Sequence, residues 1–533
     1  MDTFQFGWFQ KEWQGMKAGL SFGEPVRTGL HTYPIMRADG SQKRLHLRVE
    51  ADGNGILFVD VTDVIHLNAG AVSLVKMALD GVRERDAARI LRAAYRLDDL
   101  AAKLEAGRVY QVMEHLVEHE DGCHTCSLAG LVDQAPIFSL PTNAPYKIDV
   151  ALTYGCNNEC PHCYNEVGRF GMPSLPLAHW YRVFERVAEL GIPHVILTGG
   201  EATLHPDFFE IVRYADRLGM VVGLNSNGRT LSSEKFMQKA AEAGLNHVQV
   251  TLGSCYEELH NKIMGVESFH QTVKGIRTAL ESGVHVITNS TLMRSNMDHL
   301  EALVNFLDEL GLRTFAMNGV IHSGGGFVNP NAISYEELPT LITLVRELAE
   351  ERGMRFMWYT PTEYCRLNPI ALGVGSKKCN AGEYSICIEP NGDILPCQSY
   401  YVAAGNLLDD PWEEIWQGSL FTSFRGREED PLGYGLPEKC LGCPDMLVCG
   451  AGCRIEREAE QGVRVADMAG AGCIGCSGYY NPYAGAGGVE ISYPPAMPGG
   501  FMPPESQVKS QIRSRGGLDL IQLKMPEEET DES

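Results

Sequence analysis

The sequence predicts an α/β protein built from three parts in order along the chain. Extended and helical patterns alternate six times over residues 146–359, which is typical of βα units and a parallel sheet. Before this core, a hairpin pattern followed by three helical segments predicts a small domain. After it, eight closely spaced cysteines over residues 379–473, with a ninth at Cys476, predict a cysteine-rich domain.

Composition indicates a globular protein of several domains. The chain has 533 residues, 44% of them hydrophobic, which is enough for two to four packed domains. Its net charge of -23 argues against nucleic acid as the main substrate, because phosphate binding needs clustered Lys and Arg. No signal peptide and no membrane-spanning stretch is recognised, so we expect a cytoplasmic protein. In the cytoplasm, sixteen cysteines indicate metal or cluster ligands rather than disulfides.

The first domain begins with a predicted β-hairpin. Residues 45–50 alternate apolar and polar side chains, residues 51–55 supply turn-forming Asp, Gly and Asn, and residues 56–61 form a second apolar run. Asn68 is placed to cap the first of three helical segments. These segments are 69–79, 86–95 and 97–118. A hairpin followed by three helices has the outline of a winged helix.

This outline is similar to the small peptide-chaperone domain of pyrroloquinoline quinone biosynthesis, generalised as the RiPP recognition element. The helix start at 67–69 and the Asp80-Gly81 turn carry the resemblance. In that family an edge strand captures a leader peptide by strand addition, so we expect the 45–61 hairpin to supply the edge. A plain winged helix, acting as a scaffold or a nucleic-acid reader, is the alternative.

The central part is expected to form six βα units. The expected strands are 147–152, 194–198, 220–225, 247–252, 285–292 and 313–319. The expected helices lie near 177–190, 207–218, 232–243, 267–282, 298–310 and 334–352. In parallel sheets, ligands bind at the carboxyl ends of the strands, and two motifs lie at such ends.

The first motif is Cys156-x₃-Cys160-x₂-Cys163, directly after the first strand. Three thiolates can hold three irons of a [4Fe-4S] cluster and leave the fourth open to a reactant. A zinc half-site or a redox pair is the alternative. The second motif is the Gly199-Gly200-Glu201 turn after the second strand, with glycines where backbone passes close to a ligand.

In order and spacing the two motifs resemble the radical S-adenosylmethionine (SAM) enzymes. The resemblance implies a partial (βα)₆ barrel and a [4Fe-4S] cluster whose open iron binds the amino and carboxylate groups of SAM. An electron from that cluster would split the sulfonium and leave a 5′-deoxyadenosyl radical. Glu201 would hold the amino group of SAM. The implied SAM-binding residues are Gly199, Gly200, Glu201, Ser226, Thr251 and Asn289.

The chain departs from the family pattern near SAM. Thr251 keeps a family hydroxyl, but the aspartate that often follows it is absent. Met264 replaces the arginine expected near the SAM carboxylate, and Lys262 is the alternative cation. Some members use an acid in this region as proton acceptor. The nearby candidates are Glu257, Glu258 and His260. Because charged residues after a strand are usually solvated, we name no catalytic base.

The later cysteines follow a second spacing pattern. Gly392-x₄-Cys397 precedes Cys440-x₂-Cys443-x₅-Cys449-x₃-Cys453 and a last cysteine. This pattern resembles the SPASM extension of radical SAM peptide maturases and implies two auxiliary [4Fe-4S] clusters with four thiolates each. The implied sets are Cys379, Cys387, Cys397 and Cys453 for the first, and Cys440, Cys443, Cys449 and Cys473 for the second. Cys476 is the alternative to Cys473, and a zinc ribbon is the alternative to the clusters.

Four further cysteines stand outside these patterns. Cys255 and Cys365 are single, and we expect buried thiols. Cys123 and Cys126 form a C-x₂-C pair, either a metal half-site or a redox pair, and the sequence leaves this open.

These inferences lead to four domains and one preferred function. The expected domains are a recognition domain with its linker (1–140), a radical SAM barrel (141–360), a SPASM domain (361–477) and a Gly/Pro-rich, mostly disordered tail (478–533). We expect a maturase that uses SAM and three [4Fe-4S] clusters to abstract a hydrogen atom from a peptide or small protein with a leader. Flavodoxin or ferredoxin would supply the electron, and neither nucleic acid nor a membrane is an expected partner. The alternatives are an enzyme that acts on a haem precursor, a tetrapyrrole, and a scaffold or electron carrier with degenerate chemistry.

Overall fold

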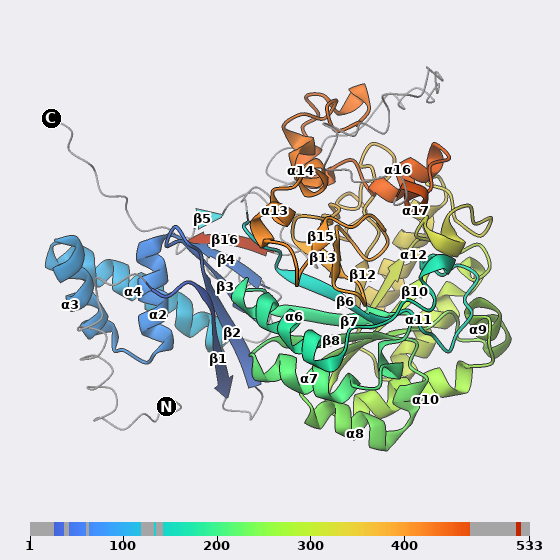
Figure 1. Cartoon of the computed structure of the whole chain (residues 1–533), viewed down its shortest axis with the longest axis horizontal. Helices are drawn as coiled ribbons and strands as arrows, with labels where there is room; N and C mark the ends of the chain where they lie inside the picture. Colours follow the sequence, from blue (N-terminus) through green and yellow to red (C-terminus); the bar gives the residue numbers. More distant parts are fainter. Residues whose placement is uncertain are drawn as a thin grey trace. The chain divides into compact units, whose positions relative to one another are not determined.

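The computed structural model describes residues 26–36, 42–59, 63–118, 133–134, 142–468 and 519–523. The chain divides into two compact units (Figure 1). The N-terminal unit comprises Met1–Asn143, Val187–Pro193 and Leu518–Ser533, and the core unit comprises Ala144–Arg186 and His194–Gly517. Most of the tail predicted at 478–533 lies outside the described residues. No helix in the described ranges is long and apolar enough to cross a bilayer.

A six-stranded sheet forms the N-terminal unit, in the order β1-β2-β3-β4-β16-β5. Strands β1 to β4 form an antiparallel meander, β16 runs parallel to β4, and β5 runs antiparallel to β16. The bounds are β1 (Gly29–Met36), β2 (Gln42–Val49), β3 (Gly55–Val59), β4 (Asp63–Leu67), β5 (Asp133–Gln134) and β16 (Asp519–Leu523). A strand from the far end of the chain therefore extends a sheet that begins near its start.

The predicted hairpin is present as β2 and β3, but the expectation that it supplies a sheet edge is wrong. β2 pairs with β1 and β3 pairs with β4, so both are interior strands. Pro34 hides β1 in the sequence, because proline cannot donate to a strand ladder. It is tolerated in β1, where it lies opposite Arg44, since β1 lies at one end of the sheet.

The three predicted helices follow β4 and are confirmed: α2 (Ala69–Leu79), α3 (Glu84–Tyr95) and α4 (Asp99–Glu118). Asn68 caps α2, because its Oδ1 accepts the N–H of Ala71 at 3.0 Å. Leu57, Ile65 and Leu91 belong to the buried core between strands and helices. The meander has four strands where a hairpin was expected, so the winged-helix description stays a prediction.

The core unit contains a sheet whose parallel strands β6 to β12 lie side by side in chain order. Six of them confirm predicted strands: β6 (Lys147–Thr153), β7 (His194–Gly199), β8 (Val221–Ser226), β9 (Leu245–Thr251), β10 (His285–Thr291) and β11 (Thr314–Asn318). The prediction missed β12 (Arg355–Trp358), which ends the sheet on one side. The result is a mixed α/β fold with a large parallel sheet.

Helices connect these strands, as predicted. They are α6 (Leu177–Glu189), α7 (Phe208–Arg217), α8 (Glu234–Glu242), α10 (Phe269–Glu281), α11 (Leu300–Glu309) and α12 (Leu338–Glu351), with α9 (Glu257–Met264) as an addition after β9. Helices α6, α7 and α8 lie together on one side of the strands (Figure 1). Because the strands are parallel, their carboxyl ends all lie at one edge of the sheet, and the helix-to-strand turns lie at the opposite edge.

The cysteine-rich part is built onto the same sheet. β13 (Ser385–Ile388) pairs in parallel with β6 and antiparallel with β14 (Asp393–Leu395), which pairs with β15 (Gly405–Asn406). Short helices follow: α13 (Trp412–Trp416), α14 (Ser419–Arg425), α15 (Met446–Cys449), α16 (Arg454–Glu460) and α17 (Val465–Met468). The pairing of β13 with β6 places Cys387 beside the strand that leads into the first cysteine motif.

Candidate active site

The first cysteine motif forms a loop at the carboxyl end of β6. The amide of Cys163 donates to the carbonyl of Cys160 at 3.1 Å, which closes a tight turn inside the motif. Burial and, to a smaller extent, the neighbouring sulfurs of Cys163 and Cys156 together raise the pKa of Cys160 to about 12. The three thiols therefore lie close enough to interact. Together their thiolates need a positive partner, and iron would supply it.

Backbone donors and polar side chains surround Cys156. The amide of Asn158 donates to Cys156 Sγ at 3.4 Å, and Nδ2 of Asn227 lies 3.9 Å from the same sulfur. Asn227 also donates to Oδ1 of Asn157 at 2.6 Å, and Arg229 bonds the Asn157 carbonyl. Hydrogen bonds of this kind favour a thiolate, so the loop fits the role of cluster ligand. Sequence reasoning missed Asn157 and Arg229, since neither belongs to a motif.

The Gly199-Gly200 turn packs directly on the start of the cysteine loop. Gly199 has φ +128°, and a Cβ there would lie 2.1 Å from the Thr153 carbonyl oxygen. A Cβ on Gly200 would lie 2.4 Å from the Gly155 oxygen. The amide of Gly200 donates to Thr153 at 2.7 Å. The glycines are thus required by contact between two backbone segments, and their contact with SAM stays a prediction.

Glu201 turns into the protein. Its side chain is fully buried, and Oε1 accepts from Thr203 Oγ1 at 2.6 Å and Ser226 Oγ at 3.0 Å. Oε2 accepts from the amide of Asn227 at 2.8 Å. Burial raises the pKa of Glu201, and these hydrogen bonds oppose that shift. Glu201 and Ser226 therefore fasten the end of β7 to the end of β8. The bond of Glu201 to the SAM amino group and the SAM contact of Ser226 stay predictions.

We predict that Glu201→Gln weakens SAM binding and lowers the melting temperature while iron content stays at the wild-type level. The amide would present a donor where donors already converge, which costs about 1–3 kcal/mol. Calorimetric titration with SAM, thermal unfolding and an iron assay measure these three quantities. Glu210→Gln, at an exposed position of α7, is the matched control. Unchanged SAM affinity in Glu201→Gln would contradict this.

Thr251 and Asn289 are neighbours across β9 and β10. They are paired residues in the parallel register at the carboxyl ends of these strands. Asn289 Nδ2 donates to Asn318 Oδ1 at 2.8 Å, whereas its own Oδ1 is buried without a hydrogen-bond partner in the part of the chain that the structure describes. An unsatisfied buried acceptor at this edge suits a bound polar molecule. Their role in SAM binding stays a prediction.

Met264 and Lys262 lie in different environments in the structure. Met264 is buried, and its sulfur lies 3.7 Å from Cys160 Sγ. Lys262 is exposed on α9. Gly265 has φ +71°, and a Cβ there would lie 2.1 Å from the Glu159 oxygen, so this turn also supports the cysteine loop. At the expected arginine position the chain thus has an apolar contact with the loop.

The surroundings of the three candidate residues near the absent aspartate do not single out a base. Glu257 is exposed and pairs with His270 at 3.1 Å, and Glu258 is also exposed. His260 is buried, contacts the Gly253 amide at 3.3 Å, and has its pKa lowered to about 4 by burial. His260 therefore has a structural role.

Seven described cysteines of the auxiliary sets gather in two groups. Cys453 interacts electrostatically with Cys379 and Cys397, and Cys387 with Cys397. That these four cysteines hold one cluster stays a prediction. The others are Cys440, Cys443 and Cys449, and Cys440 interacts electrostatically with Cys449. No three His, Cys, Asp or Glu side chains within the described ranges converge as ligands of one metal ion do. Cys473, Cys476, Cys123 and Cys126 lie outside these ranges.

A buried polar network links the first cysteine loop to the auxiliary part. Tyr401 Oη donates to Asn165 Oδ1 at 2.8 Å, and Asn165 Nδ2 donates to the Gly199 carbonyl at 3.0 Å. Arg169 pairs with buried Glu389, which also accepts from Tyr154 Oη at 2.7 Å. The network joins residues 165–169, which follow the first cysteine loop, to residues 389–401 of the auxiliary part. No motif marks these residues, so sequence reasoning missed them.

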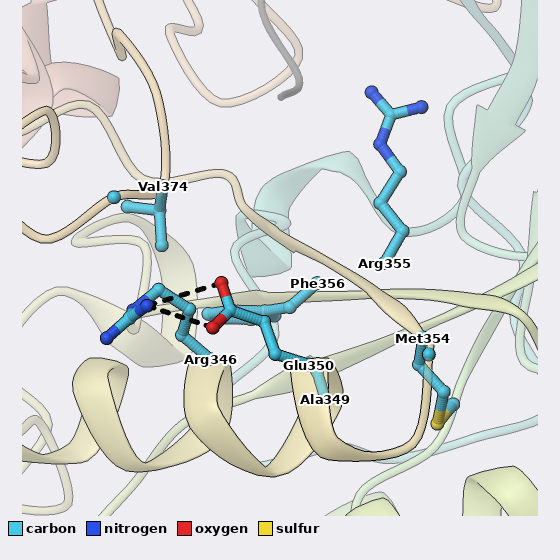
Figure 2. Close-up of a pocket in the computed structure, with 9 residues that line it drawn as sticks. Arg346, Ala349, Glu350, Met354, Arg355, Phe356 and Val374 are labelled. Atoms are coloured by element: carbon cyan, nitrogen blue, oxygen red, sulfur yellow. Dashed lines mark hydrogen bonds and ion pairs between the residues drawn. The ribbon is translucent and has the colours of Figure 1, made fainter. Parts of the chain in front are cut away.

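A cavity of about 330 Å³ lies elsewhere, at the amino end of β12 (Figure 2). Arg346 and Glu350 of α12 line it and face each other at 3.1 Å, as the dashed lines in Figure 2 show. Val374 and the start of β12 complete the wall. Because the cysteine loop follows a carboxyl strand end, this cavity is not part of the candidate active site.

Comparison with protein families agrees with this geometry. Residues 150–307 match the radical SAM superfamily model. Residues 379–444 match the iron-sulfur cluster-binding domain model, SPASM. The chain is a radical SAM enzyme. The matches cover the cysteine loop, the Gly-Gly-Glu turn and the later cysteines from Cys379 to Cys443. They indicate SAM and iron-sulfur clusters as cofactors of the enzyme.

Two curated relatives and one solved structure resemble the enzyme. It is 28% identical over 339 residues to an AdoMet-dependent heme synthase of Methanosarcina barkeri, covering 60% of this chain and 94% of that protein. It is 28% identical over 342 residues to a PqqA peptide cyclase of Ruegeria pomeroyi, covering 62% and 87%. Streptococcus suis SuiB, solved with precursor peptide SuiA, shares the fold with TM-score 0.56 and 17% identity, over 77% of this chain and 94% of SuiB.

Proposed function

We propose that this radical SAM enzyme modifies a peptide or small protein that carries a leader. The observation that carries the proposal is the extent of the fold shared with SuiB. A match over 77% of this chain is longer than residues 142–533 alone, so it includes part of the N-terminal unit. The similarity to PqqA peptide cyclases supports the same substrate class.

We assign the first cluster to Cys156, Cys160 and Cys163. When bound, the cluster and SAM supply a 5′-deoxyadenosyl radical that abstracts a hydrogen atom from the substrate. The amide of Asn158 stabilises the charge on the Cys156 sulfur, and Glu201 holds two strand ends in place.

The two later cysteine sets would hold two more [4Fe-4S] clusters, which makes three in total. With four thiolates each they have no open iron, so they suit electron transfer or substrate anchoring. A flavodoxin or ferredoxin is the expected electron donor.

The substrate leader would bind to the N-terminal sheet by strand addition beside β4. Among the described strands β1 and β5 lie at the ends of the sheet, but Pro34 blunts β1 as an acceptor. β4 already pairs with a strand from a distant segment, β16, in continuous register from Asp63 to Leu67. That contact supports β4 as a strand that accepts a partner on the side now occupied by β16. A leader would displace β16 to bind there.

A haem precursor is the second candidate substrate, because the chain is also 28% identical to the heme synthase. Short open reading frames beside the gene supply candidate peptides for a direct comparison. Reduced enzyme is incubated with SAM and either such a peptide or a tetrapyrrole, and 5′-deoxyadenosine is measured. We expect the peptide to stimulate its formation. Stimulation by the tetrapyrrole alone would favour the second candidate.

A further inference from the structure

The backbone of Thr362 and Tyr364 contacts the sulfur of Cys449. The amide of Tyr364 donates to Cys449 Sγ at 3.3 Å, and the carbonyl oxygen of Thr362 lies 3.8 Å from the same sulfur. A Cβ on Gly452 would lie 2.8 Å from the Glu363 amide nitrogen, so the two segments are in close contact. Cys365 is the next residue after Tyr364 and therefore lies beside this turn.

Cys365 also contacts the side chain of the residue that precedes Cys440. Its Sγ is 3.3 Å from Nζ of Lys439, the residue immediately before Cys440. Lys439 Nζ lies 3.0 Å from Glu363 Oε2 as well. The expectation of a buried thiol is wrong, because Cys365 lies in an irregular loop after β12 and is exposed. Cys255 is only partly buried.

We propose that Cys365 is the fourth thiolate ligand of the cluster held by Cys440, Cys443 and Cys449. It takes the place that the family resemblance gives to Cys473. The inference rests on the proposed function only in requiring a cluster at this group. Ligation releases the thiol proton and forms one sulfur–iron bond without a change of oxidation state. The Lys439 ammonium then offsets negative charge on the ligated sulfur.

Alkylation of the intact, anaerobically purified full chain tests this assignment. Iodoacetamide is added before and after iron is removed with a chelator under reducing conditions, and each cysteine is followed by mass spectrometry. We expect Cys365 to be labelled at least about tenfold faster after chelation. Cys255 is the control and should react equally in both states. Equal labelling of Cys365 in both states, with protection of Cys473 or Cys476, would overturn the proposal.

Iron content gives a second, independent measurement. Cys473→Ala/Cys476→Ala should keep the full iron content, whereas Cys365→Ala should lose iron or show the spectrum of an incomplete cluster. Full iron in Cys365→Ala, or the same iron loss in both variants, would overturn the assignment. If Cys440, Cys443 and Cys449 all react before chelation, no cluster is present there. That result would count against the proposed function as well as the Cys365 assignment. If these three cysteines are protected and Cys365 is not, only the Cys365 assignment fails.

Discussion

Replacing Cys156, Cys160 and Cys163 together with alanine should abolish SAM cleavage and remove about four of roughly twelve irons. The three cysteines lie in one loop at the carboxyl end of β6, where the amide of Asn158 donates to the sulfur of Cys156. Without them no protein ligand remains for the first cluster. Iron assay and 5′-deoxyadenosine formation in the absence of substrate measure both losses.

The remaining irons should stay, because the later cysteines lie on other segments of the chain. Cys255→Ala is the matched control, since this partly buried cysteine belongs to neither pattern. It should keep all iron and full SAM cleavage. A wild-type iron count that fits one cluster, or stoichiometric zinc in place of iron, would contradict the assignment of the later cysteines.

A chain that ends at residue 517 should bind an added peptide that the full chain excludes. Truncation removes β16 and opens the β4 side of the N-terminal sheet. The probe is a fluorescent peptide with the sequence of residues 515–526, which restores the missing strand in trans. We expect at least tenfold tighter binding to the truncated chain, measured by fluorescence anisotropy, because the full chain carries its own competitor at high effective concentration.

A proline at position 521 of the peptide is the control. Because Ile521 of β16 pairs with Ile65 of β4 and with Gln134 of β5, a proline at this position removes a backbone donor and disturbs the pairing. Binding should fall by about tenfold or more, corresponding to about 1.4 kcal/mol. Equal binding of both peptides, or no binding to the truncated chain, would show that the β4 side does not accept strands.

The sequence predicts individual helices and strands well, but it predicts poorly which strands lie side by side in a sheet. Six core strands and the Asn68-capped helix follow from periodicity and capping, which depend on nearby residues. The interior position of β2 and β3 depends on β1, whose Pro34 weakens its strand pattern, and on β4. The pairing of β4 with β16 joins residues more than 450 positions apart, and no local signal reports it.

The same limit applies to the site. Cysteine spacing singles out the first motif and the seven later ligand candidates that the structure describes, because cluster chemistry constrains their order. Their roles as ligands stay predictions. The inward turn of Glu201 depends on Ser226 and Asn227 of the next strand, and spacing cannot show it. Cys365 looks solitary in the sequence because its neighbour Lys439 lies 74 residues away.

The destination of the abstracted hydrogen atom tests the peptide-maturase function most directly. A candidate precursor peptide, deuterated at its carbon-bound positions, is incubated anaerobically with reduced enzyme and SAM, and 5′-deoxyadenosine is analysed by mass spectrometry. We predict 5′-deoxyadenosine one mass unit heavier, formed together with a modified peptide. Unlabelled 5′-deoxyadenosine, formed at the same rate with and without every candidate peptide while a deuterated tetrapyrrole transfers its label, would contradict the proposed function.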